Sequence, residues 1–404
     1  MEYLVGKIVE QIENSKNDWR DGAKGNRSLS NKKGELYSKE HIKSEVVEDA
    51  IKLEKTGLIE IEWLKGFRGN DIERLKYQLE KKELLYEYYR NHIDETFVKR
   101  QDMVRKYRTY LEEVLKGIRT PWIRCYYEDL LENTDIKNPA KQLAKQEKYA
   151  PCFQGLDQLK EPIFKRIFSK YYLGDSKKFE NECQNHIVSV ARKYFTEVIE
   201  PEMEDYEVLS QLLIEGYSQE MMVKGPLYVC VPFADGDRVI CTKDWKYGVS
   251  FNSEMLKNAK ILEDQPQIKR VISIENKANF ICADYEEDTI YVFSHGYFSP
   301  LERQFLCKLE KVLEKNIQNV EYHHSGDLDY GGVKIFQYIR NRIFPKLKPL
   351  WMDVETFQKY KEYGYEIEPS TMEKLEQLKE TELQDLIDVM VETGIGIEQE
   401  SFLV

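Results

Sequence analysis

Short apolar runs alternate with helical patterns between residues 269 and 343, and this order restricts the fold of the C-terminal part of the chain. Three runs, at 269–274, 289–294 and 319–324, have the length and composition of strands. Apolar residues at helical spacing follow, for example in segments 301–313 and 333–343. Because strands that alternate with helices usually pair in parallel, the pattern predicts a parallel sheet.

Acidic residues stand where two of these strands should end. Glu275 follows the first run, and Asp327 and Asp329 follow the third. In an open parallel sheet the crevice lies beyond the carboxyl ends of the strands, so we expect the three side chains to project into one crevice. Their mutual repulsion would be relieved by a divalent cation, and oxygen ligands suit Mg²⁺ or Mn²⁺. An Asp-rich turn that caps the next helix would also explain the two aspartates.

Residues close to these strand ends are further candidates. Lys277 lies two positions after Glu275 and would steady a phosphate. Asp353 ends a fourth predicted strand and would be an outer metal ligand. Adjacent side chains on a strand face opposite ways, so at most one of His323 and His324 points at the site. A structural histidine and a catalytic one are both compatible with His324.

The chain is acidic overall, with 72 Asp and Glu residues against 60 Lys and Arg residues and a net charge of -12. This balance excludes a general basic surface for nucleic acid, so contact with DNA must use local patches or a partner that delivers the DNA. One local candidate is Ser176-Lys177-Lys178 at a predicted helix start, where a phosphate would meet backbone N–H groups. A capped helix with surface lysines explains the same residues.

The length of 404 residues, 41% of them hydrophobic, allows two or three domains. We predict a multidomain protein of the α/β and α+β classes. An arm domain with helical and winged-helix-like parts spans 1–120, and a middle winged-helix domain spans 121–265. The middle domain includes short strands around the hairpin turn Asp235-Gly236-Asp237. The parallel sheet belongs to a catalytic domain at 266–404.

Four segments of the arm domain carry a secondary-structure signal. The polar segment 14–33 is expected to be largely mobile. Segment 42–53 has helical spacing, and after a glycine 58–63 alternates as a strand. This order is common in winged-helix units, but any small α+β module gives the same pattern. Segment 71–117 is predicted to be helical, either as one long helix or as a hairpin broken near Asn91.

Cysteine usage and hydropathy indicate the compartment. The seven cysteines lack Cys-x-x-Cys spacing, and their odd number fits reduced thiols better than a disulfide framework. We therefore expect a cytoplasmic protein. There is no run of eighteen apolar residues and the N-terminus lacks the layout of a signal peptide, so nothing predicts an association with a membrane.

The acidic motifs resemble those of a known family. A Glu at the end of one strand and Asp-x-Asp at the end of a later one resembles the Toprim pattern of type II topoisomerases, bacterial primases and several nucleases. More specific segments together resemble the JetD family of Wadjet plasmid-defence systems: Ile274-Glu275-Asn276, Ser294-His295-Gly296, Tyr322 to Gly332, Glu398-Gln399-Glu400 and, further upstream, Leu173 to Lys177. The resemblance covers about 150–404. Tyr330 departs from it, because the family often has a proline there.

The resemblance implies a Toprim nuclease. Glu275, Asp327 and Asp329 would be both catalytic and metal-binding, with Mg²⁺ or Mn²⁺ as cofactor. It also implies a homodimer in which a catabolite-activator-like winged-helix domain accompanies the Toprim domain, a layout similar to the topoisomerase VI A subunit. The implied partners are double-stranded circular plasmid DNA and three other subunits, namely an SMC-like ATPase, a kleisin and a small winged-helix protein.

Two other functions are compatible with the residues. A tyrosine strand-transferase like the topoisomerase VI A subunit needs a nucleophilic tyrosine, and Tyr171, Tyr172 and Tyr206 lie in the relevant region. A non-catalytic DNA-binding or assembly subunit would use the acidic cluster only structurally. A strand-transferase would leave covalent protein–DNA adducts, and a non-catalytic subunit would bind no metal.

Overall fold

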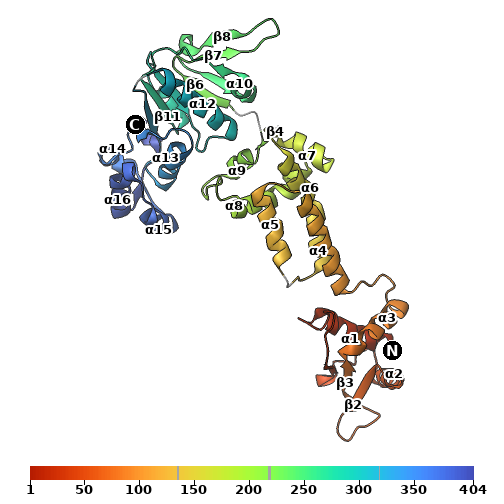
Figure 1. Ribbon diagram of the computed structural model, residues 1–404. Coiled ribbons are helices and arrows are strands. Elements are labelled where there is room, and N and C mark those ends of the chain that lie inside the picture. Colours follow the sequence, from red (N-terminus) through yellow and green to blue (C-terminus); the bar gives the residue numbers. More distant parts are fainter. Residues whose placement is uncertain (134–135, 217–219, 318) are drawn as a thin grey trace. The chain divides into compact units, whose positions relative to one another are not determined.

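The computed structural model describes residues 1–133, 136–216, 220–317 and 319–404 (Figure 1). The chain forms two compact units, Met1–Gln154 and Gly155–Val404.

The first unit combines a small sheet with helices. Its elements are α1 (Glu2–Asn14), β1 (Asn26–Ser30), α2 (Lys43–Lys55), β2 (Ile59–Trp63), β3 (Ile72–Gln78), α3 (Lys82–His92), α4 (Arg100–Gly117), α5 (Pro121–Glu132) and α6 (Pro139–Gln158), the last of which continues past the unit. The three strands form an antiparallel sheet in the order β1-β3-β2. Apolar side chains that are fully buried hold the unit together, among them Ile8, Leu53 and Leu75.

The structure confirms the predicted helix at 42–53 and strand at 58–63, and it corrects two other predictions for this unit. Segment 71–117 is not helical throughout, because Ile72–Gln78 is the central strand β3. Ile72, Leu75 and Leu79 are spaced as on a helix, but pairing on both sides of β3 decides the local structure. The polar segment 14–33 contains β1, which pairs with β3 along its whole length. The winged-helix assignment of this unit stays a prediction.

The second unit begins with short helices and a small sheet. These elements are β4 (Ile163–Phe164), α7 (Lys165–Leu173), the π-helix η3 (Phe179–Cys183), α8 (Gln184–Tyr194), α9 (Asp205–Gln211), β5 (Ile214–Glu215), β7 (Tyr228–Val231), β8 (Arg238–Cys241), α10 (Ser253–Asn258) and β10 (Lys260–Ile261). Strands β7 and β8 pair antiparallel from Val231 and Arg238, which confirms the hairpin predicted at Asp235-Gly236-Asp237.

A six-stranded sheet forms the centre of the second unit, in the order β14-β13-β11-β12-β6-β9. Its strands are β6 (Glu220–Lys224), β9 (Val249–Asn252), β11 (Arg270–Ile274), β12 (Thr289–Phe293), β13 (Glu321–Ser325) and β14 (Leu347–Pro349). The last four pair in parallel, as predicted. Strands β6 and β9 add antiparallel pairs, so the sheet is mixed and includes strands from both sides of the predicted boundary at 265.

Helices follow the strands of this sheet along the chain, and α11 and α13 contact it. They are α11 (Lys277–Cys282), α12 (Pro300–Asn316), α13 (Tyr330–Arg342), α14 (Val354–Tyr360), α15 (Pro369–Gln377) and α16 (Gln384–Thr393), followed by the 3₁₀-helix η7 (Gln399–Leu403). Phe280 of α11 packs against Ile272, Ile274 and Tyr291 of the sheet. Helix α16 ends at Gly394, whose φ of 68° is the left-handed conformation expected after a helix.

The cysteines and the hydropathy of the helices both agree with the expectations from the sequence. Among the described residues, none of the seven cysteines is joined in a disulfide, which agrees with the reduced thiols expected from their number and spacing. In the part of the chain that the structure describes, no helix is both long enough and apolar enough to span a membrane.

Candidate functional site

Parallel pairing of β11 with β13 places two of the predicted acidic residues together. Ile274 and Ser325, the last residues of the two strands, are paired. The backbone N–H of Glu275 donates to Ser325 O at 2.9 Å. In return the side-chain Oε2 of Glu275 accepts a hydrogen bond from the backbone N–H of Asp327 at 3.2 Å. Glu275 and Asp327 therefore meet at the carboxyl edge of the sheet.

Glycines make this approach possible. A Cβ atom on Gly326 would lie 2.4 Å from Glu275 Oε2 and 2.9 Å from His324 Nε2. A Cβ atom on Gly332 would lie 2.1 Å from the backbone oxygen of Asp327. A side chain on Gly332 would collide with the backbone of Asp327, and one on Gly326 would displace the side chains of Glu275 and His324, so both glycines allow the close packing around the two carboxylates.

Asp329 reaches the same loop but uses both of its carboxylate oxygens there. Oδ1 accepts from the backbone N–H of Gly332 at 2.7 Å and caps the N-terminus of α13. Oδ2 accepts from the hydroxyl of Tyr365 at 2.8 Å. The helix-cap explanation of the Asp-rich turn therefore holds for Asp329. It does not describe Asp327, whose side chain turns toward Gln399.

Carboxylates act on one another at this edge of the sheet. Burial raises the pKa of Glu275 well above its ordinary value, and the charges of Asp327 and Asp329 raise it further. Burial and the charge of Asp329 raise the pKa of Asp327 to about 7, and the exposed Glu398 and Glu400 add to this effect. Among the described residues, no lysine or arginine is a main contributor to either pKa.

Gln399 connects the two strand ends. Its backbone N–H donates to Asp327 Oδ1 at 2.7 Å, and its side-chain Nε2 donates to Ser325 Oγ at 2.6 Å. Its Oε1 accepts from the backbone N–H of Asn276 at 2.8 Å, and its backbone oxygen accepts from Asn279 Nδ2 at 2.9 Å. The side chain is fully buried. Gln399 therefore fixes the position of Asp327 relative to the segment that carries Glu275.

Sequence reasoning missed this role of Gln399. The tail Glu398-Gln399-Glu400 stood out only through the family resemblance, and no role follows for the glutamine from local pattern. The tail reaches the site because Leu328 and Ile397 form an isolated antiparallel bridge, with N–H···O distances of 2.8 and 3.0 Å. A contact between positions so far apart in the chain has no periodic signature.

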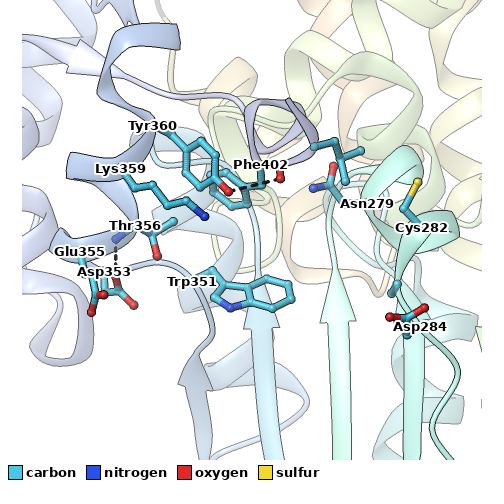
Figure 2. Close-up of a pocket in the computed structure, with 12 residues that line it drawn as sticks. Asn279, Cys282, Asp284, Trp351, Asp353, Glu355, Thr356, Lys359, Tyr360 and Phe402 are labelled. Atoms are coloured by element: carbon cyan, nitrogen blue, oxygen red, sulfur yellow. Dashed lines mark hydrogen bonds between the residues drawn. The ribbon is translucent and has the colours of Figure 1, made fainter.

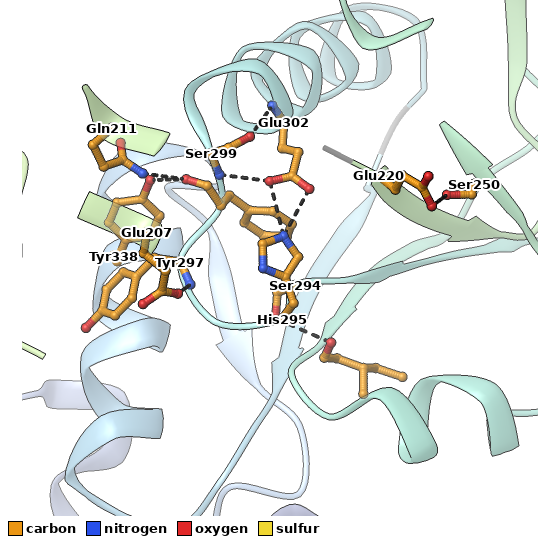
Figure 3. Close-up of polar contacts among 12 residues, drawn as sticks. Glu207, Gln211, Glu220, Ser250, Ser294, His295, Tyr297, Ser299, Glu302 and Tyr338 are labelled. Atoms are coloured by element: carbon orange, nitrogen blue, oxygen red, sulfur yellow. Dashed lines mark hydrogen bonds and ion pairs between the residues drawn. The ribbon is translucent and has the colours of Figure 1, made fainter. Parts of the chain in front are cut away.

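A second polar group follows the neighbouring strand β12. His295 Nε2 donates to Glu302 Oε1 at 3.0 Å, and Glu302 is 1% exposed (Figure 3). The backbone N–H of Ser299 donates to Glu302 Oε2 at 2.8 Å, which completes a capping box at the start of α12. From α9, Glu207 Oε1 accepts from the backbone N–H of Tyr297 at 3.0 Å.

The pKa shifts of His295 and Glu302 favour their charged forms, whereas those of Glu275 and Asp327 favour the neutral forms. Burial opposes the charge of His295, but the hydrogen bond and the charge of Glu302 outweigh it, so the pKa of His295 is raised. Burial likewise opposes the charge of Glu302, yet His295 lowers the pKa of this carboxyl. The pair is therefore stable in its ionised form.

Three other predicted residues lie near the strand ends. His324 is completely buried with Nδ1 2.9 Å from Ser273 Oγ, and burial lowers its pKa to about 3, so its imidazole is neutral. Lys277 is exposed in the first turn of α11. Asp353 caps α14 by accepting from the backbone N–H of Thr356 at 2.7 Å.

The predicted phosphate patch lies elsewhere in the second unit. Ser176, Lys177 and Lys178 lie between α7 and η3, outside the sheet that carries the carboxylates. Ser176 and Lys177 are exposed, and the backbone N–H of Lys177 donates to Asp175 Oδ1 at 2.8 Å. The structure does not bring these residues to the acidic cluster.

The acidic cluster has the donors for a divalent cation, but they are not arranged as a finished cage. Within the described ranges, no group of three or more His, Cys, Asp or Glu side chains is positioned to hold a metal ion. Glu275 Oε2 and Asp327 Oδ1 accept backbone hydrogen bonds, and the described residues supply no donor to the other oxygen of either carboxylate. Two partly buried carboxylates with raised pKa values fit a hard cation, whereas Asp329 would first have to leave Tyr365.

Comparisons with known proteins agree with the resemblance seen in the motifs. Residues 234–403 match the family model described as Wadjet protein JetD, C-terminal. This range contains Glu275, Asp327, Asp329 and Gln399. Over 356 residues the chain is 27% identical to the Wadjet protein JetD of Bacillus cereus strain Q1. The aligned residues make up 85% of this chain and 82% of that protein. Both comparisons confirm the predicted resemblance: the chain is similar to the Wadjet protein JetD.

Proposed function

We propose that this chain is the nuclease subunit of a Wadjet plasmid-defence system and that it hydrolyses phosphodiester bonds of double-stranded circular DNA with Mg²⁺ or Mn²⁺. The similarity to JetD supports the Wadjet assignment. The observation that carries the proposed chemistry is the meeting of Glu275 and Asp327 at one edge of the sheet, where no described lysine or arginine is a main contributor to the pKa of either carboxyl.

Glu275 and Asp327 would hold the metal ion, and Asp329 would join them after releasing Tyr365. When bound, Mg²⁺ or Mn²⁺ would neutralise negative charge on the phosphate and activate the attacking water. Gln399 keeps Asp327 in position through the hydrogen bond to Oδ1. A Glu275 carboxylate that does not ligate the metal would instead accept a proton from the attacking water. Lys277, exposed beside Glu275, would contact a phosphate oxygen.

Partners are part of the proposal because the chain is acidic. A net charge of -12 gives weak electrostatic attraction to DNA, so the other Wadjet subunits, an SMC-like ATPase, a kleisin and a small winged-helix protein, would bring plasmid to the site. We further propose that the chain acts as a homodimer, so that each DNA strand would meet one acidic cluster.

The test is cleavage of supercoiled and linear plasmid by the reconstituted complex in Mg²⁺, Mn²⁺ or EDTA. We expect cleavage of the circular substrate in either metal and none in EDTA. Asp327→Asn should strongly reduce cleavage, whereas Asp388→Asn on the exposed side of α16 should retain it. Unchanged cleavage by Asp327→Asn, or cleavage in EDTA, would contradict the proposal.

The same reaction also tests strand transfer by a tyrosine. Tyr171 and Tyr206 are 77% and 61% exposed, so both are candidates for the nucleophile. Hydrolysis leaves no protein on the DNA after denaturation, whereas transfer to a tyrosine leaves a covalent adduct. Adducts that disappear in Tyr171→Phe or Tyr206→Phe would replace the hydrolytic proposal with strand transfer.

A further inference from the structure

A groove of about 940 Å³ lies in the first unit and takes no part in the function proposed above. It forms where three segments that are remote in sequence meet, namely the end of α1, the start of α4 and the start of α6. The charged residues that line it are Glu13, Lys16, Arg100, Lys137 and Lys141. Four cations and one carboxylate therefore line this groove, in a chain whose net charge is -12.

Arg100 holds the walls of this groove together. Its Nη1 donates to Glu13 O at 3.1 Å, and its Nη2 donates to Ile136 O at 2.9 Å. Its Cζ lies 4.5 Å from the centre of the Trp19 ring. The guanidinium is therefore used within the protein. Because it joins the end of α1 to the residue that leads into α6, the lysines that follow these two segments line the same groove.

The carboxylate of Glu13 does not pair with the lysines of the groove. Its Oε2 accepts from the backbone N–H of Arg100 at 2.7 Å, and its Oε1 accepts from the hydroxyl of Tyr86. The three lysines that line the groove are exposed, and among the described residues none of them lies within ion-pair distance of a carboxylate. Their positive charge is therefore available to a ligand.

The positive charge continues from the groove along α6. Lys141 and Lys145 are four residues apart, so they lie on one face of the helix, about 6 Å apart along its axis. Lys145 is also exposed and, in the part of the chain that the structure describes, has no carboxylate at ion-pair distance. Segment 137–148 contains four lysines and one acidic residue. Other lysines of this unit differ, since Lys52 and Lys76 pair with carboxylates at 2.8 Å.

A cavity of about 580 Å³ in the second unit has the opposite charge balance. Figure 2 shows its acidic residues Asp284, Asp353 and Glu355. Lys359 is the one basic residue among the described residues that line it. Such a lining repels a phosphate, whereas the groove of the first unit attracts one. Charge complementarity therefore selects the groove, and not the cavity, as a site for a polyanion.

We infer that the lysine surface, which consists of Lys16, Lys137, Lys141 and Lys145, binds the sugar–phosphate backbone of duplex DNA. The inference rests on the proposed nuclease function for the identity of the polyanion. It extends that function by giving the first unit a role in holding the substrate. Lysine side chains are flexible point charges, so they contact phosphates without reading the sequence. A surface that continues past the groove along a helix suits a polymer better than a single small anion.

The experiment measures binding of the full chain in EDTA to fluorescein-labelled duplexes of about 20 base pairs, between about 50 and 200 mM NaCl. We expect wild type to bind two unrelated sequences equally, because the phosphates are the target. The triple variant Lys137→Gln, Lys141→Gln, Lys145→Gln should bind about tenfold or more weakly at the lowest salt. Its slope of log K against log[NaCl] should be less steep by about 2–3. The corresponding Lys→Arg triple variant keeps the charges and should keep both the affinity and the slope.

The matched control is Lys39→Gln, Lys55→Gln, Lys65→Gln, which removes three exposed lysines elsewhere in the same unit and should bind like wild type. Equal thermal midpoints of wild type and all variants check that lost binding is not lost folding.

Four results would overturn the inference: no measurable binding by wild type at the lowest salt, a wild-type affinity and slope in the Gln variant, an equal loss in the control, or an equal loss in the Arg variant. If the Gln variant keeps DNA binding and instead loses the other Wadjet subunits in a pull-down, the lysine surface is a protein-docking site. Because EDTA prevents metal-dependent cleavage, DNA binding can succeed where the nuclease proposal fails, and the reverse.

Discussion

Two glutamates near the carboxyl edge of the central sheet, Glu275 and Glu302, experience opposite environments. Burial raises the pKa of Glu275, and its strongest charged neighbours, Asp327 and Asp329, raise it further. Burial also acts on Glu302, but a hydrogen bond from His295 at 3.0 Å lowers its pKa. Burial alone therefore does not decide whether a carboxyl group is charged, because the neighbouring group decides it.

The difference separates a structural pair from a candidate reactive site. Glu302 and His295 offset each other's charge and stabilise the turn between β12 and α12. Glu275 and Asp327 repel each other in the absence of a cation, so their arrangement costs stability that the remaining fold must supply. Substitutions in the two groups should therefore have opposite effects on stability.

The largest effect is expected from Asp327→Asn. With a metal ligand lost, cleavage by the complex should fall by about 10²–10³-fold or more. The same change should stabilise the metal-free protein at pH 8. The folded pKa of about 7 is above the ordinary 3.8, so ionisation of Asp327 lowers stability as the pH rises between these values.

Thermal unfolding in EDTA at pH 5 and pH 8 measures this second effect. The midpoint of Asp327→Asn should exceed that of wild type at pH 8, by roughly 2–4 °C for each kcal/mol of repulsion removed. The gain should shrink at pH 5, where Asp327 is already protonated in the folded protein. A variant less stable than wild type at pH 8 would show that Asp327 is not under electrostatic strain.

A smaller loss of cleavage is expected from Gln399→Leu. The substitution keeps the side-chain size but removes the hydrogen bonds to Ser325 Oγ and Asn276 N. Residues that orient metal ligands typically contribute about 10–100-fold to affinity or activity. Metal titration should show an apparent Kd weakened to a similar extent, with Gln358→Leu on the exposed surface of α14 as the control. Normal metal affinity in Gln399→Leu would mean that its backbone contact to Asp327 is sufficient.

His295→Gln should mainly affect stability. Breaking a buried ion pair costs about 3–5 kcal/mol, and the cost here should be lower because His295 is 30% exposed. Because the pKa of His295 is raised, its charge stabilises the fold at pH values below 6.5, and this stability is lost as the pH rises through the folded pKa. The lowered pKa of Glu302 contributes stability above 4.5 that is lost as the pH falls.

Urea unfolding across pH therefore tests the pair. The difference in free energy of unfolding between wild type and His295→Gln should be greatest between pH 4.5 and pH 6.5 and should decrease toward pH 9. Lys308→Gln, on the same helix as Glu302, is the control. A difference that does not vary with pH would mean that His295 acts by packing and not by charge.

These residues differ in how far the sequence predicts them. Apolar periodicity predicted the parallel strands. Because a parallel sheet brings the carboxyl ends of its strands to one edge, the positions of Glu275 and Asp327 after two strands predicted that they would lie close together. The capping box of Ser299 and Glu302 has a local signature that could have been recognised.

Other features depend on contacts that local pattern does not contain. Gln399 reaches Asp327 across 72 positions, and Tyr365 reaches Asp329 across 36. Strand β3 has helix-like apolar spacing and becomes a strand only because β1 and β2 pair with it. Local pattern therefore predicted which groups carry the charge, while tertiary contacts determine how those groups are held.

The smallest effect is expected from Tyr365→Phe. Loss of one hydrogen bond to Asp329 Oδ2 should cost about 0.5–1.5 kcal/mol of stability in EDTA. If Asp329 must leave Tyr365 to join the metal site, the same change removes a competitor for this carboxylate, and Mn²⁺ should bind a few-fold more tightly. Calorimetric titration with Mn²⁺ measures the affinity, and Tyr363→Phe on the exposed surface nearby is the control. Weaker binding in Tyr365→Phe would instead show that the hydroxyl holds Asp329 in its metal-binding position, so that the conformation seen here is already the competent one.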